Sequence, residues 1–475
     1  MIDSPLASRT FSALDQRRFA AVSGDHNPIH LDPIAARRTQ AGMCVVHGVH
    51  AAIWAIDALI GSSQLSAPIA RLKVQFNKFI PLDRTVVLSG LRRVGEVTRA
   101  FVVLDGVGAI SLSISHGPAE IENEALLSEA VCVPSREPAA LDLSDIPGRT
   151  GWLASAAEED VADLFPRAAE VLGRGRLRAI TKLSTLVGMV CPGLHSMLSS
   201  LDLTITTETK NVTGLSFAVN HVDDRFRRAD IAVAGLGIRG TVAAFVRQPP
   251  VDQPRGRDMI GRVNTNEFSG TTALIVGGSR GLGALTARII AAGGGRVIIT
   301  YAVGVVEAEE IGREIGSAQC RVIQYDVRGD ATCQLSSIGE INQIYYFATP
   351  HIFPQKQKLF DRAIFSEFSS YYVDGFDALC VALQSHLETS ISVFYPSSVA
   401  VEDRPRGMTE YAMAKAAGEV LCRDMDRYLP KIRVVAHRLP RLLTDQTAVV
   451  LPVQTDDAVD TMLPIVRAMC ATTRV

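Results

Sequence analysis

The chain has 475 residues and a formal net charge of -2; 47% of its residues are hydrophobic and 21% are charged. This composition resembles that of ordinary soluble proteins and allows about two to four domains with sizeable cores. Because it has no block of like charge and no membrane-length apolar run, the sequence argues against a nucleic-acid surface, a membrane surface and a bilayer span. The eight cysteines include no CxxC pair, so we expect a reduced cytoplasmic protein with no metal, no disulfide framework and no signal peptide.

Two segments rich in proline and polar residues interrupt the chain. They are PSREPAALDLSDIPGRT, residues 134–150, and QPPVDQPRGRDMIGRVNTN, residues 248–266. Such residues discourage packed helix or sheet, so we interpret both segments as linkers. The predicted division is 1–133, linker 134–150, 151–250, linker 251–267 and 268–475.

The first piece predicts an apolar helix followed by antiparallel strands. A helical pattern at 14–21 leads into a polar turn, and residues 48–60 place apolar side chains at helical spacing. Apolar and polar residues then alternate at 72–76 and 109–116. This order indicates an α+β fold in which a sheet wraps around a helix.

The second piece is interpreted as a degenerate repeat of the first. Helical patterns at 158–164 and 177–187 precede strand patterns at 215–220 and 241–246. We align CPGLHSMLSSLDLTI, residues 191–205, with VHGVHAAIWAIDALI, residues 46–60, so that Gly193 matches Gly48 and His195 matches His50. The alternative is chance similarity between two apolar helices. The second copy has no counterpart of the polar motif described next.

An acid, an amide and an imidazole crowd into SGDHNPIH, residues 23–30. Asp25 and His30 could converge on one water, removing its proton and returning another to carbon, which is general acid-base chemistry. Asn27 could hold the turn or the substrate, and free N–H groups where VHG opens a helix at Gly48 could stabilise an oxyanion. The alternative is an ordinary turn in which Asp25 caps a helix.

Three further histidines, His47, His50 and His195, lie in apolar runs. We expect them to be satisfied core or interface residues.

The pattern DQRRFAAVSGDHNPIHLDP, followed by AGMCVVHG, resembles the MaoC-like (R)-specific enoyl hydratase family, which has the hot-dog fold. The resemblance implies that Asp25 and His30 are catalytic and that Gly48 belongs to the oxyanion hole. Some relatives are double hot-dogs with one active half. By this resemblance, the site lies in the N-terminal half and the second half shapes the acyl pocket.

In the third piece, strands and helices alternate to the end of the chain, which predicts an α/β domain with a parallel sheet. The run VGGSRGLG, residues 276–283, follows a strand and opens a helix, where glycines let the backbone approach a pyrophosphate. Tyr411 and Lys415 of YAMAK share one helix face, and Ser398 precedes them. A phenol near an ammonium and a hydroxyl can protonate an alkoxide as hydride reaches carbon.

These motifs resemble the short-chain dehydrogenase/reductase family, which has a Rossmann-type doubly wound parallel sheet. The resemblance implies catalytic roles for Ser398, Tyr411 and Lys415. It implies cofactor contacts for Gly277, Ser279, Arg280, Gly281, Leu282, Gly283, Asp326, Val327, Ala348, Tyr411, Lys415, Pro440 and Thr444.

The third piece also departs from this family's pattern. FATP, residues 347–350, replaces NNAG, the helix asparagine is absent near SYYVDGFDAL, and Arg441 follows Pro440 in place of glycine. The interpretation of this piece as a slow, unusual or inactive reductase therefore stays open.

Charge favours NADP(H) over NAD(H). After the second strand, RVIITYAVG offers no acid to bind a free ribose 2'-hydroxyl, whereas Arg280 could meet a 2'-phosphate. The alternative is that Arg280 is a solvated loop cation.

The two predicted activities share a 3-hydroxyacyl thioester. We therefore expect a bifunctional enzyme that combines (R)-3-hydroxyacyl dehydration or enoyl hydration with NADPH-dependent 3-ketoacyl reduction, in fatty-acid or polyketide-type synthesis. Its partners would be acyl-coenzyme A or acyl-carrier-protein thioesters, and the reductase family implies a homodimer or homotetramer. One alternative is a working hydratase with an impaired, cofactor-binding reductase-like domain; another is a working reductase whose hot-dog pair only binds acyl chains.

Overall fold

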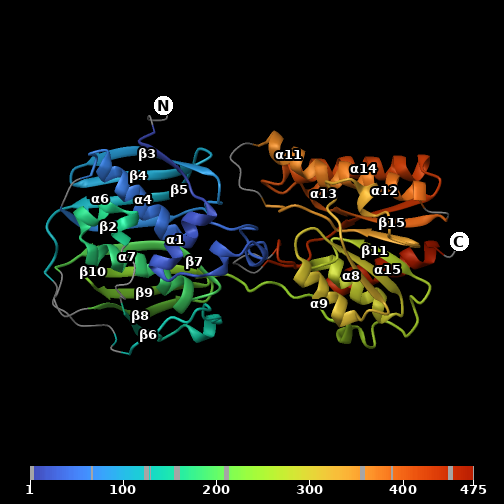
Figure 1. Cartoon of the computed structure of the whole chain (residues 1–475), viewed down its shortest axis with the longest axis horizontal. Coiled ribbons are helices and arrows are strands. Elements are labelled where there is room, and N and C mark those ends of the chain that lie inside the picture. Colours follow the sequence, from blue (N-terminus) through green and yellow to red (C-terminus); the bar gives the residue numbers. More distant parts are fainter. Residues whose placement is uncertain are drawn as a thin grey trace. The chain divides into compact units, whose positions relative to one another are not determined.

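The computed structural model forms two compact units, which meet in the sequence at Pro249 and Pro250 (Figure 1). No helix among the described residues has both the length and the apolar character needed to cross a membrane. The structure describes residues 5–65, 68–121, 128, 130–154, 161–207, 213–353, 359–386, 389–447 and 453–473.

The first unit contains a ten-stranded antiparallel sheet with the order β1-β3-β4-β5-β2-β7-β10-β9-β8-β6. Read from its two ends, the sheet shows the same order of strands in each half, and β2 pairs with β7 where the halves meet. The strands are β1 Ala7–Thr10, β2 Ile69–Phe76, β3 Thr85–Val94, β4 Val97–Leu104, β5 Val107–His116, β6 Thr150–Ala154, β7 Ser196–Ile205, β8 Gly214–Asp223, β9 Arg228–Gly235 and β10 Ile238–Val246.

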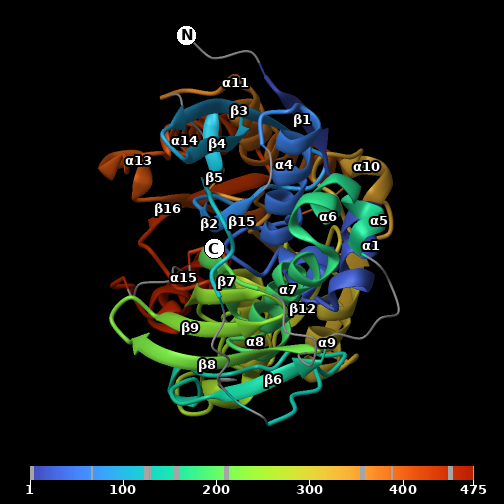
Figure 2. The same cartoon turned by 90° about the vertical axis from the view of Figure 1, so that its left-hand side faces the viewer.

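Helices α1, α4, α6 and α7 lie against the sheet (Figures 1 and 2). The central helix α4 is apolar almost all round, so it forms the core inside the sheet rather than an amphipathic surface helix. The helices are α1 Ala13–Ser23, α2 Pro28–Leu31, α3 Pro33–Ala36, α4 Gly48–Gly61, α5 Val161–Leu164, α6 Pro166–Leu172 and α7 Arg174–Thr185, with a π-helical turn at Leu186–Val190 and a 3-10 turn at Leu143–Asp145.

The predicted alignment of residues 191–205 with residues 46–60 is wrong. Residues 196–205 form strand β7, and Gly193 lies in a turn with φ of 81°. A Cβ there would come within 2.1 Å of the Ala139 carbonyl oxygen, so a tight backbone approach requires this glycine. The helix that precedes β7 is α7, just as α4 precedes β2. The alignment failed because a buried strand and a central helix are both apolar runs.

Both predicted linkers contribute packed residues. Ile146, in the first segment, is fully buried in the core of the first unit, and Met259, in the second segment, is buried against the core of the second unit. Of the helix predicted at 158–164, residues 158–160 lie outside the described residues, and α5 begins at Val161. The division of the chain into three pieces stays a prediction.

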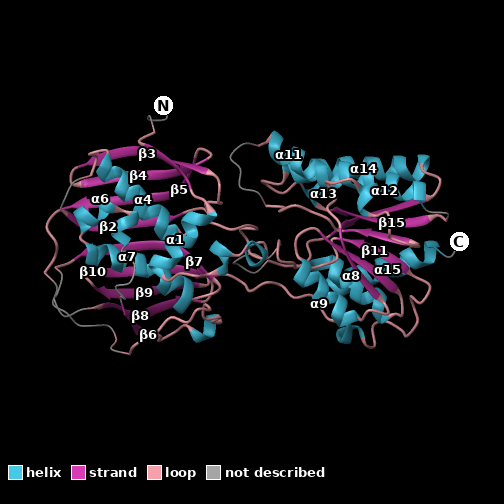
Figure 3. Ribbon diagram, in the orientation of Figure 1, coloured by secondary structure: helices cyan, strands magenta, loops and turns pink. Residues whose placement is uncertain are grey.

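The second unit is built on a six-stranded parallel sheet with the order β13-β12-β11-β14-β15-β16. Separate hydrophobic cores lie on its two faces, one beneath α12 and α14 and the other beneath α8 and α15 (Figure 3). The strands are β11 Thr272–Val276, β12 Arg296–Tyr301, β13 Cys320–Gln324, β14 Gln343–Tyr346, β15 Ile391–Ser398 and β16 Ile432–Leu439.

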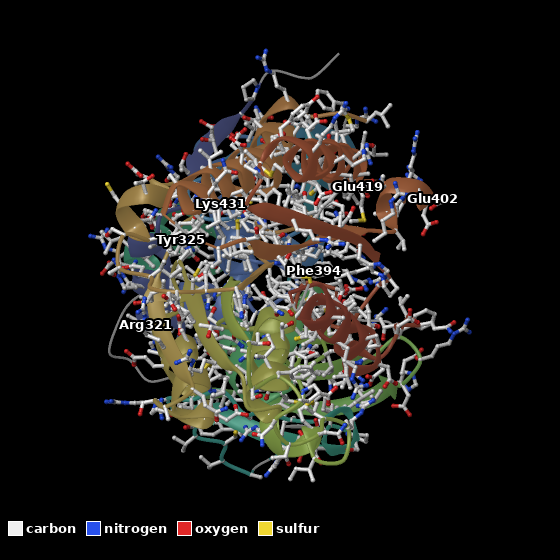
Figure 4. All side chains as sticks on the ribbon, turned by 90° about the vertical axis from the view of Figure 1, so that its right-hand side faces the viewer. Arg321, Tyr325, Phe394, Glu402, Glu419 and Lys431 are labelled. Carbon is white, nitrogen blue, oxygen red and sulfur yellow. The ribbon has the colours of Figure 1, made fainter. Side chains whose placement is uncertain are left out.

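Helices connect the parallel strands of this unit, and α15 follows the last strand. They are α8 Gly281–Ala292, α9 Val305–Ile315, α10 Ala331–Gln334, α11 Arg362–Ser369, α12 Gly375–His386, α13 Ala400–Asp403, α14 Thr409–Tyr428 and α15 Ala458–Thr473, with a 3-10 turn at Gly256–Met259 and a π-helical turn at Ser370–Asp374. Arg438 of β16 forms ion pairs with Glu402 of α13 at 3.3 Å and with Glu419 of α14 at 2.8 Å. Figure 4 labels the two glutamates.

The strand order reverses between β11 and β14. In open parallel sheets, ligands bind at the carboxyl ends of the strands beside such a reversal. The glycine-rich turn after β11 lies at this position, which confirms the predicted Rossmann-type arrangement.

Two candidate active sites

The polar motif of the first unit sits between two helix ends. Helix α1 ends at Ser23, and Gly24 follows with φ of 81°. The side-chain oxygen of Asn27 accepts the N–H of Ile29 at 3.2 Å and so caps α2. Asp25 Oδ1 accepts the N–H of Asn27 at 3.1 Å. The cap of α2 is therefore Asn27, and Asp25 does not fill the helix-capping role considered above.

The structure brings Asp25 and His30 together. Side-chain oxygen and nitrogen atoms of Asp25, His30 and His47 lie within 4.8 Å of one another, and Asp25 is only 2% exposed. His30 Nδ1 donates to the Val45 carbonyl at 2.8 Å, so in the neutral ring Nε2 is the free base. Burial raises the pKa of Asp25 and lowers the pKa of His30, which favours the uncharged form of each group.

Together with Asp25 and His30, His47 forms a set of side chains that could serve as metal ligands. However, its Nδ1 lies 2.8 Å from Gln16 Oε1 and its Nε2 lies 3.0 Å from the Asp25 carbonyl oxygen. Metal binding by this trio would require His47 to give up one of these contacts.

Helix α7 and the π-helical turn after it complete the surroundings of Asp25. The Ser184 hydroxyl, on α7, donates to Asp25 Oδ2 at 2.6 Å. In the π-helical turn, a Cβ on Gly188 would come within 2.3 Å of Asp25 Oδ1, so the absence of a side chain makes room for the carboxylate. Asn27 Nδ2 donates to the Gly188 carbonyl at 2.8 Å. No motif in residues 184–188 pointed to these contacts.

Gly48 is the first residue of α4. The first N–H groups of a helix have no carbonyl acceptor within that helix. The first α-helical bond in this turn runs from the Ala51 N–H to the His47 carbonyl. A Cβ on Gly48 would lie 3.0 Å from the ring of Phe76, so glycine permits the close packing at this helix start. The position suits a donor to a developing oxyanion.

The other histidines differ from one another in their surroundings. His47 and His50 are buried, and His50 stacks on Phe19 with ring centroids 4.7 Å apart. His195 lies in the turn before β7 and is partly buried. His47 and His50 lie in the core as expected, but the Nδ1 atoms of His50 and His195 are buried without a hydrogen-bond partner among the described residues.

The glycine-rich turn of the second unit forms a cradle that side chains would fill. Gly277 and Gly281 have φ of 79° and 55°, a region that favours glycine. A Cβ on Gly283 would lie 2.2 Å from the Gly277 carbonyl oxygen. Next to this turn, a Cβ on Gly277 would lie 3.1 Å from the backbone nitrogen of Ala348. The turn, with Ser279 and Leu282 inside it, therefore fits a pyrophosphate at the start of α8.

The loop after β12 is apolar where a cofactor ribose would lie. Val303 is exposed there, and so are Val305 and Val306 at the start of α9. Arg280, in the glycine-rich turn, forms an ion pair with Asp445 at 3.6 Å. The alternative considered above, that Arg280 is a solvated loop cation, is therefore incomplete, because Arg280 has a partner from the loop after β16.

The remaining predicted cofactor residues lie at strand ends. Asp326 follows β13 and pairs with Arg328 through contacts of 3.1 and 2.8 Å, while Val327 is buried. Pro440 and Thr444 lie in the loop after β16, where the Thr444 N–H donates to Thr447 Oγ1 at 2.8 Å.

Ser398, Tyr411 and Lys415 come together from β15 and α14. A hydrogen bond with the Ser398 hydroxyl lowers the pKa of Tyr411, but burial raises this pKa by more. Lys415 Nζ donates to the Pro396 carbonyl at 2.7 Å. Burial lowers the pKa of Lys415 to about 7.

Tyr372 is a member of this site that the sequence prediction missed. It lies in the π-helical turn, in the segment that lacks the helix asparagine of the short-chain dehydrogenase/reductase pattern. Lys415 Nζ lies 3.8 Å from the centroid of its ring, and its hydroxyl lies 2.5 Å from Thr349 Oγ1 in the FATP segment. Irregular helix turns of this kind are common at functional sites. The turn could have pointed to Tyr372, but it is visible only in the structure.

The MaoC like domain model matches residues 4–100, and the short chain dehydrogenase model matches residues 271–452. The chain therefore carries a MaoC-like dehydratase domain and a short-chain dehydrogenase domain.

Two curated proteins resemble parts of the chain. The 3-hydroxyacyl-thioester dehydratase X of Mycobacterium tuberculosis is 40% identical over 73 residues, covering 15% of this chain and 25% of that protein. The uncharacterized oxidoreductase YhxC of Bacillus subtilis is 23% identical over 192 residues, covering 38% of this chain and 64% of that protein. The chain thus spans less than two thirds of either relative.

Among solved structures, FolM alternative dihydrofolate reductase 1 from Brucella canis, complexed with NADP, is 20% identical. The match covers 44% of this chain and 91% of that chain, with a TM-score of 0.38.

Proposed function

We propose that this chain is a bifunctional acyl-thioester enzyme. The first unit would dehydrate (R)-3-hydroxyacyl thioesters or hydrate enoyl thioesters, and the second would reduce 3-ketoacyl thioesters with NADPH. The observation that carries the proposal is the pairing of buried Asp25 with partly buried His30 beside the start of α4, within a MaoC-like domain. The repeated strand order supports a double hot-dog fold with one acid-base pair.

The dehydratase step needs one base and one acid. Because burial favours the uncharged forms, His30 Nε2 takes the C2 proton and Asp25 protonates the C3 hydroxyl, which leaves as water while the C2–C3 double bond forms. The N–H of Gly48 donates to the thioester oxygen as negative charge accumulates there. Hydration is the reverse sequence, with the water held between the two groups.

The reductase step relies on three side chains. A bound reduced nicotinamide supplies the hydride. Ser398 orients the substrate carbonyl oxygen, and Tyr411 gives its phenolic proton to that oxygen. The ammonium of Lys415 stabilises the phenolate that forms. The second candidate function, an impaired reductase-like domain that only binds cofactor, draws support from the ring of Tyr372 covering Lys415 Nζ and from the FATP segment.

We infer a preference for NADPH from Arg280 and from the absence of an acid in residues 301–304. Arg280→Ser should weaken NADPH binding about tenfold and leave NADH binding nearly unchanged, because only NADPH carries the 2'-phosphate. Isothermal titration calorimetry with both cofactors checks this. Equal weakening of both cofactors would contradict the inference.

The two reactions share a 3-hydroxyacyl intermediate, and covalent linkage can raise its local concentration. NADPH use favours synthesis of the fatty-acid or polyketide type, with coenzyme A or acyl-carrier-protein thioesters as substrates. We expect a homodimer or homotetramer.

The decisive experiment supplies purified protein with a 3-ketoacyl-coenzyme A and NADPH and follows the hydroxy and enoyl products by mass spectrometry. Asp25→Asn should lower formation of the enoyl product by about 10³-fold and leave reduction intact. Tyr411→Phe should abolish NADPH oxidation while enoyl hydration continues. If wild-type protein binds NADPH stoichiometrically but reduces no ketoacyl thioester, the impaired-reductase alternative replaces the bifunctional proposal. If Asp25→Asn has no effect on hydration, the proposed dehydratase site is wrong.

A further inference from the structure

Arg247, directly after β10 in the first unit, is a buried cation that the proposed reaction does not use. It is only 4% exposed. Its Nη2 donates to the Leu194 carbonyl at 2.7 Å. Its Nε–H is buried without a hydrogen-bond acceptor among the described residues. A planar guanidinium in this state has donors left for a ligand.

No acidic side chain among the described residues pairs with this guanidinium. Burial alone lowers the pKa of Arg247, to about 10, so the group stays charged at neutral pH. The nearby groups do not compensate, because Arg227 is another cation and burial lowers the pKa of His195 to about 4. The carboxylate of Asp142 is exposed; it acts on the pKa of His195, whereas burial is the one cause of the shift at Arg247. A buried charge without a counter-ion is costly, which points to an anionic ligand in the working protein.

Arg247 also lies close to the acid-base pair. The Leu194 carbonyl oxygen that accepts from Arg247 Nη2 at 2.7 Å also accepts from Asn27 Nδ2 at 3.4 Å. The charge of Arg247 acts on His30, whose pKa it helps to lower. An anion bound here would therefore lie near the reacting carbons. The phosphates of coenzyme A or a carrier protein are held away from those carbons by the pantetheine arm, so they are the wrong part of the substrate.

We propose that Arg247 binds a carboxylate on the acyl group, so that the preferred substrates of the first unit are thioesters of acids with a second carboxyl group. This inference rests on the proposed dehydratase function and names its substrate class. Nε and a terminal nitrogen of a guanidinium form a fork that matches the two oxygens of a carboxylate, and such paired contacts discriminate strongly against a neutral group. Arg247 would thus set specificity, while Asp25 and His30 perform the proton transfers.

The test uses matched trans-2-enoyl-coenzyme A thioesters that end either in a methyl group or in a carboxylate, at short, medium and long chain lengths. Hydration by the whole chain is followed at 1:1 competition of the two members of each pair. At one chain length, the carboxylate-ended thioester should have a kcat/KM about tenfold or more above that of its partner. Arg247→Gln should remove this preference, mainly through KM of the carboxylate-ended thioester, and Arg247→Lys should restore part of it.

Arg227→Gln is the matched control, because Arg227 lies beside Arg247 and donates to the Val246 carbonyl at 2.9 Å. It should leave the preference unchanged. Thermal melting of each variant separates loss of fold from loss of specificity. If folded Arg247→Gln protein loses activity equally toward both thioesters, or if wild type prefers the methyl-ended thioester at every length, the inference is overturned while the dehydratase proposal stands.

A separate outcome tests the two proposals independently. If neither thioester is hydrated, the dehydratase proposal fails. Calorimetric binding of the same thioesters to wild type and to Arg247→Gln then decides the role of Arg247. Tighter binding of the carboxylate-ended thioester by wild type alone supports the carboxylate site, and equal binding by both proteins rejects it.

Discussion

The two candidate sites are assembled in different ways. In the second unit, Ser398, Tyr411 and Lys415 come from β15 and α14, which are near one another along the chain. In the first unit, Asp25 and His30 come from the turn after α1 and from α2, but the contacts around Asp25 come from Ser184 in α7 and Gly188 in the following π-helical turn. The second half of the first unit has no acid-base pair of its own, but it is still part of the candidate site. The motif marks the candidate site, and the repeat supplies its surroundings.

Among the substitutions that test this difference, Gly188→Ala should have the largest effect. A Cβ would come within 2.3 Å of Asp25 Oδ1 and 2.7 Å of Oδ2, so the carboxylate must move. Hydratase kcat/KM should fall about 10²-fold, because displacement of a reacting group by about an ångström has this effect. NADPH-dependent reduction by the same protein should be unchanged. Steady-state kinetics of both reactions measure this.

Gly61→Ala is the control for that substitution. Gly61 is also helical, and a Cβ there would meet the guanidinium of Arg167, the end of a flexible side chain that can move. Its hydratase activity should match wild type. Full activity in Gly188→Ala would show that the second half does not confine Asp25.

A smaller effect is expected from Ser184→Ala. The Ser184 hydroxyl stabilises the Asp25 carboxylate, so its removal should raise the pKa of Asp25 further above the usual range. The pH profile of hydratase kcat/KM should move to higher pH, and its maximum should fall about tenfold. Thr181→Ala, which removes a hydroxyl bonded to the Leu177 carbonyl on the same helix, should leave the profile in place. A profile that moves equally in both variants would assign the effect to the helix rather than to Asp25.

The smallest effect is expected in the second site, where Tyr372 of the π-helical turn contacts Lys415 of α14. The ring of Tyr372 favours the charged form of Lys415, whose pKa is about 7. Tyr372→Leu should lower this pKa, so ketoreduction should decline at a pH lower by about half a unit. Tyr372→Phe keeps the ring and should keep the wild-type profile. A shift in Tyr372→Phe as large as in Tyr372→Leu would assign the effect to the hydroxyl contact with Thr349 instead.

Several features could be predicted from local patterns. The apolar run of α4, the alternation in β2 and β5, and the glycine-rich turn between β11 and α8 all follow from short-range periodicity or backbone freedom. The alignment of residues 191–205 failed for the opposite reason. A short apolar run fits a buried strand as well as a helix, and only its pairing with neighbouring strands decides between them.

The sequence by itself determined which groups can do chemistry: Asp25 and His30 in one motif, and Tyr411 and Lys415 in another. Only the tertiary structure decided what surrounds them. Register between β2 and β7 and the packing of α7 bring Ser184 to Asp25 across more than half of the first unit's chain. The same packing brings Arg247 to the Leu194 carbonyl that Asn27 also contacts, with no acidic partner among the residues that the structure describes. Such contacts join residues far apart in sequence, and their energies depend on burial and distance, which no local pattern encodes.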